Sequence, residues 1–272
     1  MVTALVLGTD SRSNDWGGLA DTIIVAQLSA DRKNLHLVSI TRDSYVEIPG
    51  YNRGKINSAF GKGGIPLLRD TVSHLLGGLE IDLVVQTNFN GFIALTRAMD
   101  GFTVDNKHAN SRKVISTGRV VDFPKGPVKL ENTDGLIYVR ERKGLPRGDL
   151  DRAERGRAAL IGMMKRLVEI TDKEPAKLAE LFPMVYRNVK VEGDLGVEQL
   201  PALVELGRNF AGGSGKVTSL MVPIADFATV GGQSVNRLDS GRTAELGEAL
   251  KAGDLSAYVA KYGEDYAPTG RR

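Results

Sequence analysis

Two aspartates stand where short apolar stretches of the chain meet polar residues. Asp10 belongs to Gly8-Thr-Asp10-Ser-Arg12, directly after a predicted strand, and Asp21 opens another strand that runs to Leu28. Two carboxylates at strand ends suit Mg²⁺, which takes one or two protein carboxylates and completes its shell with water and substrate phosphate. The same positions also suit aspartates that only form turns. The spacing alone leaves both interpretations open.

Basic residues follow further along the chain. Arg42 comes after the predicted strand 35–40, and Lys55 precedes a glycine-containing stretch, 61–64, which we expect to be a loop before a helix. Backbone N–H groups at a helix N-terminus attract phosphate. The stretch lacks the spacing and the Lys-Ser/Thr ending of a Walker loop, so an ordinary loop fits it as well.

The densest group of arginines lies between residues 138 and 155. Arg140 and Arg142 share one side if the backbone there is extended, and Asp149 and Arg152 share one face at a predicted helix start. Guanidinium groups bind phosphate oxygens bidentately and keep their charge. Converging arginines therefore fit a pyrophosphate and a transferring phosphoryl group. A solvated, salt-bridged helix start is the alternative, because acidic residues alternate with these arginines.

The composition narrows the classes of function. The chain has 272 residues, 42% of them hydrophobic, and a formal net charge of +3, which predicts a folded core and argues against nucleic acid as a partner. The absence of cysteine excludes disulfides, thiol catalysis and Cys-type zinc sites. No apolar run approaches the roughly 20 residues of a membrane span, and no signal peptide is visible.

Alternating strands and helices must position these residues. We predict strands at 3–8, 22–28, 35–40, 81–87, 102–105 and 217–224, and helices at 65–76, 89–99, 132–139, 151 onward, 197–210 and 243–262. Asp151 and Glu154 match a capping box, and the polar stretch 106–132 is predicted to hold loops and one hairpin. This order indicates an α/β layered fold. We place one domain at 1–235 and a helical tail at 236–272, after the glycines at 231–232.

Together and in this order, the motifs resemble the LytR-CpsA-Psr family. The similarity spans residues 7 to 155 and rests on Gly8-Thr-Asp10-Ser-Arg12, Asp21-Thr22, Ser39-Ile-Thr-Arg42-Asp43, Ile48-Pro-Gly50, Lys55-Ile-Asn57 with Gly63-Gly64, Ile81-Asp82, Tyr138-Val-Arg140-Glu-Arg142, and Asp149, Arg152 and Arg155 at three-residue intervals. The resemblance implies a three-layer α/β/α sandwich around a mixed central sheet, with an apolar groove for a polyprenyl lipid.

The resemblance also implies an activity and roles for the matching residues. Family members move a glycopolymer phosphate from a polyprenyl-pyrophosphate carrier onto peptidoglycan, with pyrophosphatase activity on the side. By position, Asp10 and Asp21 resemble the Mg²⁺ ligands, and Asp149 would orient an arginine or assist proton transfer. The residues implied at the pyrophosphate are Arg12, Arg42, Lys55, Arg140, Arg142 and Arg152.

The chain departs from the family pattern at a few places. Leu19-Ala20 stand where Arg-Ser is usual before the second acid, Thr41 replaces a frequent proline, and Gly156 replaces a frequent glutamine. Two alternative functions stay open. The missing arginine would fit a non-catalytic protein that binds polyprenyl phosphate. A lipid pyrophosphate phosphatase would need the same residues as a transferase. The family implies a domain on the extracellular face of the bacterial cytoplasmic membrane, held by an anchor that lies outside this chain.

Overall fold

A mixed six-stranded sheet forms the centre of the computed structural model, which describes residues 1–11, 16–193, 207–210 and 215–264. The strand order is β11-β6-β1-β2-β3-β12, where β1 and β6 are parallel, β3 and β12 are parallel, and the other neighbours are antiparallel. The strands are β1 Val2–Thr9, β2 Ala20–Leu28, β3 Asn34–Ser39, β6 Leu83–Asn88, β11 Lys190–Glu192 and β12 Lys216–Met221.

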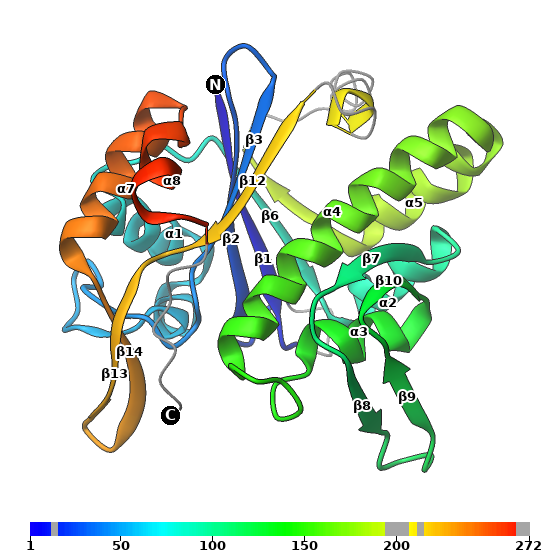
Figure 1. The fold of residues 1–272 in the computed structure, drawn as a ribbon, viewed down its shortest axis with the longest axis horizontal. Helices are drawn as coiled ribbons and strands as arrows, with labels where there is room; N and C mark the ends of the chain where they lie inside the picture. Colours follow the sequence, from blue (N-terminus) through cyan, green and yellow to red (C-terminus); the bar gives the residue numbers. More distant parts are fainter. Residues whose placement is uncertain (12–15, 194–206, 211–214, 265–272) are drawn as a thin grey trace.

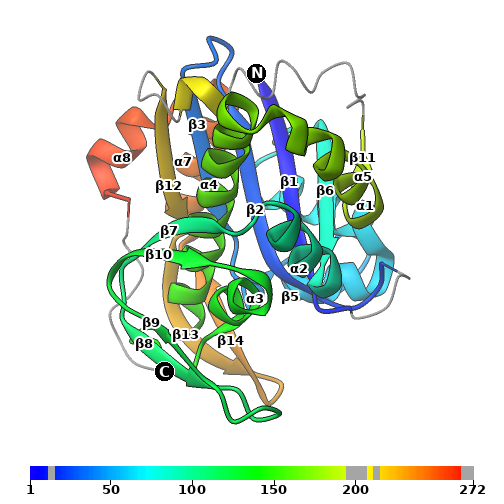
Figure 2. The same ribbon diagram turned by 90° about the vertical axis from the view of Figure 1, so that its right-hand side faces the viewer.

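Helices cover both faces of this sheet, which confirms the predicted three-layer α/β/α sandwich (Figure 1). One face carries α1 Ile56–Leu75, α7 Ser240–Ala252 and α8 Ser256–Tyr262, and the other carries α2 Phe89–Ala98, α3 Asn132–Arg140, α4 Asp149–Lys173 and α5 Leu178–Asn188, joined to α4 by the 3₁₀ turn Pro175–Lys177. Figure 2 shows α4 lying along the sheet, with α2 and α3 beside it. No helix among the described residues is long and apolar enough to cross a membrane.

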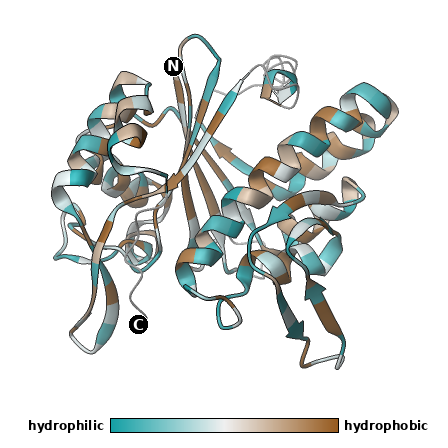
Figure 3. Cartoon of the chain, viewed as in Figure 1, coloured by the Kyte–Doolittle hydropathy of each residue, from teal (hydrophilic) through white to brown (hydrophobic). Residues whose placement is uncertain are grey.

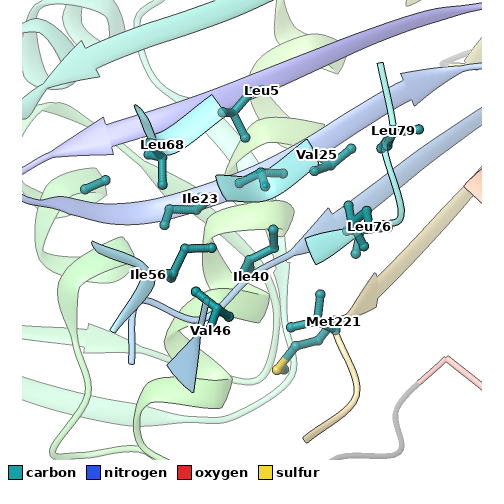
Figure 4. Close-up of a cluster of buried hydrophobic side chains, with 14 of the residues drawn as sticks. Leu5, Ile23, Val25, Ile40, Val46, Ile56, Leu68, Leu76, Leu79 and Met221 are labelled. Carbon is teal, nitrogen blue, oxygen red and sulfur yellow. The ribbon is translucent and has the colours of Figure 1, made fainter. Parts of the chain in front are cut away.

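The two faces of the sheet are packed unequally. Along β1, Leu5 and Leu7 are fully buried against the α1 side, whereas Val6 and Gly8 on the opposite face are only half-buried. Apolar residues of the strands (Figure 3) and of α1 thus form a tight core on one side, with Ile23, Val25, Ile40 and Leu68 among its members (Figure 4). The α4 side is less completely filled, and this difference positions the site described below.

Four two-stranded sheets accompany the central sheet among the described residues. They are β4 Tyr45–Val46 with β5 Gly54–Lys55, β7 Phe102–Asn106 with β10 Gly126–Leu130, β8 Asn110–Lys113 with β9 Val120–Phe123, and β13 Ile224–Val230 with β14 Gln233–Leu238. The stretch 106–132 therefore holds the predicted hairpin, β8–β9, and also β10, which pairs back to β7. The predicted helix at 197–210 lies outside the described residues except for 207–210, which are helical.

Three local predictions are wrong. The stretch 61–64 is not a loop before a helix but a kink inside α1, where Gly63 and Gly64 leave helical geometry just before Pro66. Helix α4 begins at Asp149, and Asp151 forms no capping box, because its carboxylate accepts hydrogen bonds from Arg147 instead.

The glycines at 231–232 do not separate a tail from the domain. Both have positive φ, 55° and 77°, and form the two-residue turn between β13 and β14. Strand β14 runs through the expected boundary at residue 235, and its buried Asn236 donates to Thr41 Oγ1 at 2.8 Å. Helix α7 then packs against α1, so the predicted helical tail lies against the sandwich.

Candidate active site

An apolar cavity of about 190 Å³ lies between the sheet and helices α2, α3 and α4. Its wall is built from Val6 and Gly8 on β1, Ile24 on β2, Val85 on β6, Phe89, Phe92 and Leu95 on α2, Leu136 and Val139 on α3, and Gly156, Ala159, Leu160 and Met163 on α4. The half-buried face of β1 thus faces this space. Because Gly156 has no side chain, α4 leaves room above Thr22 and Ile24. The resemblance implies an apolar lipid groove, and this cavity is a candidate for it.

A cleft of about 690 Å³ adjoins the apolar cavity and differs from it in charge. Seven basic side chains line it, against two acidic ones: Arg42, Arg112, Lys113, Arg140, Arg142, Lys143 and Arg152 against Asp21 and Glu141. We call it the cationic cleft. Asp21, Leu136, Arg140 and Arg152 line both spaces. The junction of the two spaces is therefore a place where a molecule with an apolar tail and an anionic head could bind.

At this junction, Asp21 holds two of the predicted arginines. Arg42 Nη1 donates to Asp21 Oδ1 at 2.6 Å, and Arg152 Nη1 lies 3.8 Å from Asp21 Oδ2. Burial alone would lower the pKa of Arg42, but the hydrogen bond and the charge of Asp21 outweigh it and raise that pKa. Burial does prevail at Arg152, where it lowers the pKa, yet an arginine keeps its proton at neutral pH.

Asp149 also lies beside Arg152 and Arg42. Its Oδ1 lies 2.8 Å from Arg152 Nη2 and 3.9 Å from Arg42 Nε, and its side chain is only 3% exposed. Asp149 lines neither the apolar cavity nor the cationic cleft. Of the two roles that the resemblance implies, this position favours orienting Arg152 over proton transfer.

Arg140 and Arg142 differ from Arg42 and Arg152 because neither forms an ion pair with a described residue. Arg140 stacks on the ring of Phe89 at 4.1 Å from the centroid. The expected extended pair is wrong, since Arg140 is the last residue of α3 and only Glu141 after it is extended. Among the described residues, both guanidinium charges therefore remain available to a bound anion.

The sequence analysis missed Glu141, which lies between the two arginines and holds the backbone after α3. Its buried carboxylate accepts the N–H of Arg142 at 2.8 Å and of Gly144 at 3.1 Å, and Arg112 Nε lies 3.3 Å away. The sequence shows an acidic residue between two arginines, but it does not show which groups that residue contacts.

Arg155 belongs to the scaffold of the site. It is buried, stacks on Tyr138 at 4.3 Å, and donates to Asn106 Oδ1 and to Asn110 Oδ1 at 3.1 and 2.6 Å. Burial lowers the pKa of Arg155 and raises that of Tyr138 to about 12. Arg155 thus joins α4 to the base of the β8–β9 hairpin.

Two predicted site residues lie apart from the arginine group. Lys55 Nζ pairs with Asp43 at 2.8 Å, and Lys55 lines neither the apolar cavity nor the cationic cleft. Asp10 also lines neither space, and its Oδ1 accepts the N–H of Leu19 at 2.7 Å. Arg12 lies outside the described residues.

Most of the sequence matches a known protein family. The model described as "LytR_cpsA_psr family" matches residues 1–252. The chain belongs to this family. Its fold agrees: the crystal structure of Bacillus subtilis TagV superposes with a TM-score of 0.77 at 24% identity, covering 92% of this chain and 96% of TagV.

Curated members of the LytR_cpsA_psr family add names to this relationship. A protein of Oceanobacillus iheyensis named polyisoprenyl-teichoic acid–peptidoglycan teichoic acid transferase TagU is 30% identical, over 91% of this chain and 77% of its own length. Corynebacterium glutamicum LcpA, a cell wall biosynthesis protein, is 29% identical over 86% of this chain and 52% of its own length. A structure titled "TagT bound to LI-WTA" has a TM-score of 0.71 at 25% identity, covering 92% of this chain and 89% of TagT.

Proposed function

We propose that this protein transfers a glycopolymer phosphate from a polyprenyl-pyrophosphate carrier onto peptidoglycan, on the extracellular face of the bacterial cytoplasmic membrane. The observation that carries the proposal is the position of Arg140 and Arg142, two cations with no ion partner among the described residues. Arg140 borders both the apolar cavity and the cationic cleft. The names of the TagU relatives support the same reaction.

The donor would bind across the junction of the two spaces. Its polyprenyl chain would occupy the apolar cavity, where burial of apolar surface stabilises it by about 25 cal/mol per Å². Its pyrophosphate would lie between Arg140, Arg142 and Arg152, whose guanidinium groups suit phosphate oxygens.

Mg²⁺ is the cofactor that we propose for this site. Asp21 borders both spaces, and one carboxylate with substrate phosphate and water is a sufficient ligand set for Mg²⁺. When bound, Mg²⁺ neutralises negative charge on phosphate oxygens. Asp10 would contribute only if its carboxylate also reached the junction, because its Oδ1 is engaged by the Leu19 N–H.

In the transfer step, a peptidoglycan hydroxyl forms a new O–P bond to the phosphorus nearer the glycan. The bridging P–O bond breaks, and the lipid leaves as a monophosphate on the side of the apolar cavity. The hydroxyl proton passes to the leaving phosphate or to water. Arg140, Arg142 and Arg152 neutralise the charge that spreads over the transferring group, while Asp149 holds Arg152 in place.

The decisive experiment supplies a radiolabelled polyprenyl-pyrophosphate glycan and soluble peptidoglycan fragments to wild type and to Arg142→Ala, with Mg²⁺ or with EDTA. We expect label on peptidoglycan only with wild type and Mg²⁺. Cleavage of the donor with no labelled peptidoglycan would indicate a lipid pyrophosphate phosphatase. Tight donor binding without any cleavage would indicate a binding protein. Transfer that is unchanged by EDTA would remove Mg²⁺ from the proposal.

A further inference from the structure

The β8–β9 hairpin forms a wall of the cationic cleft that the proposed step does not use. Residues 112–116, on β8 and the turn after it, line the cleft together with Lys143. The hairpin pairs only with itself, and it projects away from the sandwich near α3 (Figures 1 and 2). One wall of the cleft is therefore formed by a hairpin that is separate from the central six-stranded sheet.

Three contacts fix this wall relative to the arginines. Arg112 Nε lies 3.3 Å from Glu141, the residue between Arg140 and Arg142. Nearer the turn, Arg119 makes a bidentate pair with Asp134 at the start of α3, with one hydrogen bond of 3.0 Å. At the base, Asn110 accepts from Arg155 at 2.6 Å. A wall held in this way can position a ligand with respect to Arg140 and Arg142.

The cleft side of the hairpin offers two kinds of contact. Ile115 is 91% exposed, the highest value for a large hydrophobic residue in the described part of the chain. Lys113 is exposed beside it, Lys143 is exposed on the segment after α3, and neither lysine pairs with a described acid. An apolar surface beside unpaired ammonium groups fits a glycan: the C–H face of a sugar ring packs on Ile115, and a carboxylate on the glycan meets a lysine.

The geometry of the transfer step indicates which glycan this is. In phosphoryl transfer the attacking and leaving oxygens lie roughly in line. The lipid phosphate leaves toward the apolar cavity, so the attacking hydroxyl must come from the cationic cleft. We infer that the hairpin binds the acceptor, a carboxylate-bearing glycan, through Lys113 and Ile115, with Lys143 completing the site. This inference rests on the proposed function.

Binding of soluble probes tests the inference without any turnover. One probe is a disaccharide-peptide fragment of peptidoglycan, which carries carboxylates, and the other is a neutral chitin oligosaccharide. We expect Lys113→Gln to weaken binding of the acidic fragment about fivefold, as for a partly exposed ion pair, and to leave the neutral probe unchanged. Lys113→Arg should restore binding, and Ile115→Ser should weaken both probes.

Matched controls come from strand β9 of the same hairpin, where Val120 stands opposite Lys113, and from the flank of the hairpin. Val120 is 54% exposed on β9 but does not line the cleft, so Val120→Ser should bind both probes as wild type does; Lys125→Gln is the matching control for charge. Equal binding by all variants, or an equal loss in Val120→Ser and Ile115→Ser, would overturn the inference.

Steady-state transfer kinetics separate the acceptor from other ligands. We expect Lys113→Gln to raise KM for the acceptor several-fold more than KM for the donor. An equal rise in both would assign the hairpin to the donor, and a defect seen only with anionic vesicles would assign it to the membrane; either result contradicts the inference. Hairpin-dependent binding by a wild-type protein that transfers nothing would instead sink the transferase proposal and support the glycan site.

Discussion

Arg42 and Asp21 form the shortest ion pair at the junction of the apolar cavity and the cationic cleft, 2.6 Å between Nη1 and Oδ1. Both side chains are mostly buried, so this pair is shielded from solvent more than a surface pair would be. The carboxylate that holds Arg42 is also the one proposed for Mg²⁺. Arg42 and the proposed Mg²⁺ would therefore share the carboxylate of Asp21.

This arrangement predicts strong coupling between the two residues. Asp21→Asn and Arg42→Ala should each lower the rate of donor cleavage by about 10²- to 10³-fold, and the double variant should lose much less than the product of the two effects, because each change disrupts the same contact. Cleavage rates over a Mg²⁺ titration measure both effects. The exposed pair Arg237–Asp226, 3.7 Å apart, is the control and should show no coupling. Independent, multiplicative losses at Asp21 and Arg42 would rule out a shared contact.

The unpaired state of Arg142 predicts a loss of function without a loss of stability. Arg142→Ala should lower cleavage about 10²- to 10³-fold, while its free energy of unfolding stays within about 0.5 kcal/mol of wild type, as at sites without structural partners. Arg142→Lys should recover only part of the rate, because an ammonium group cannot bind phosphate bidentately. Urea unfolding and donor cleavage measure the two quantities. A marked drop in stability would mean that Arg142 has a structural partner in the chain.

Gly156 controls the space left in the apolar cavity. A Cβ atom there would lie 3.5 Å from Thr22 Cγ2, an ordinary contact, so Gly156→Leu should be accommodated while its longer side chain fills the cavity. Leucine also favours a helix over glycine by somewhat less than about 1 kcal/mol, which supports α4. We expect affinity for a long polyprenyl phosphate to fall at least about tenfold, and affinity for inorganic pyrophosphate to stay the same.

The control for this variant is Gly241→Leu, on the exposed first turn of α7. It should bind the lipid as wild type does. Unchanged lipid binding by Gly156→Leu would place the polyprenyl chain outside this cavity.

His36 predicts a loss of stability in mild acid. It is buried in β3, and this burial lowers its pKa below the ordinary 6.5. The nearby charge of Lys216 lowers the pKa further, whereas the contact with the Gly253 carbonyl and the charge of Asp254 oppose the shift, more weakly than burial drives it. Below pH 6.5 the unfolded chain binds a proton that the folded chain resists. The contribution of His36 to the free energy of unfolding is therefore complete above pH 6.5 and declines as the pH falls below it.

Urea unfolding between pH 7.5 and pH 5 checks this prediction, where His36→Gln should decline less steeply than wild type. His74→Gln is the control for removing a histidine outside the core, because the His74 side chain is exposed. An identical slope for His36→Gln and wild type would show that other groups cause the acid loss.

Much of the fold could be predicted because its signals are local. Apolar runs such as 22–28 and 35–40 form β2 and β3, and the spacing of Leu160, Ile161 and Met164 places the apolar face of α4 over the sheet. The errors also arise where local signals are ambiguous. Two glycines in succession gave no indication whether they form a loop, as expected at 61–64, or a kink within one helix, as found at Gly63 and Gly64.

The arginine group was predicted by residue type, but the role of each member depends on partners far away in the chain. Arg152 reaches the backbone carbonyl of Asp21, 131 residues away. Lys55 binds Asp43 rather than facing the cleft.

By itself, then, the sequence determined the family, the alternation of strands and helices, and the residue types that bind phosphate, since these depend on short-range patterns and on side-chain chemistry. Only the tertiary structure decided which cations remain unpaired, where the apolar cavity meets them, and that the β8–β9 hairpin stands beside them. An unpaired charge or a cavity is defined by the distances to every surrounding element, and those distances exist only once the chain has folded.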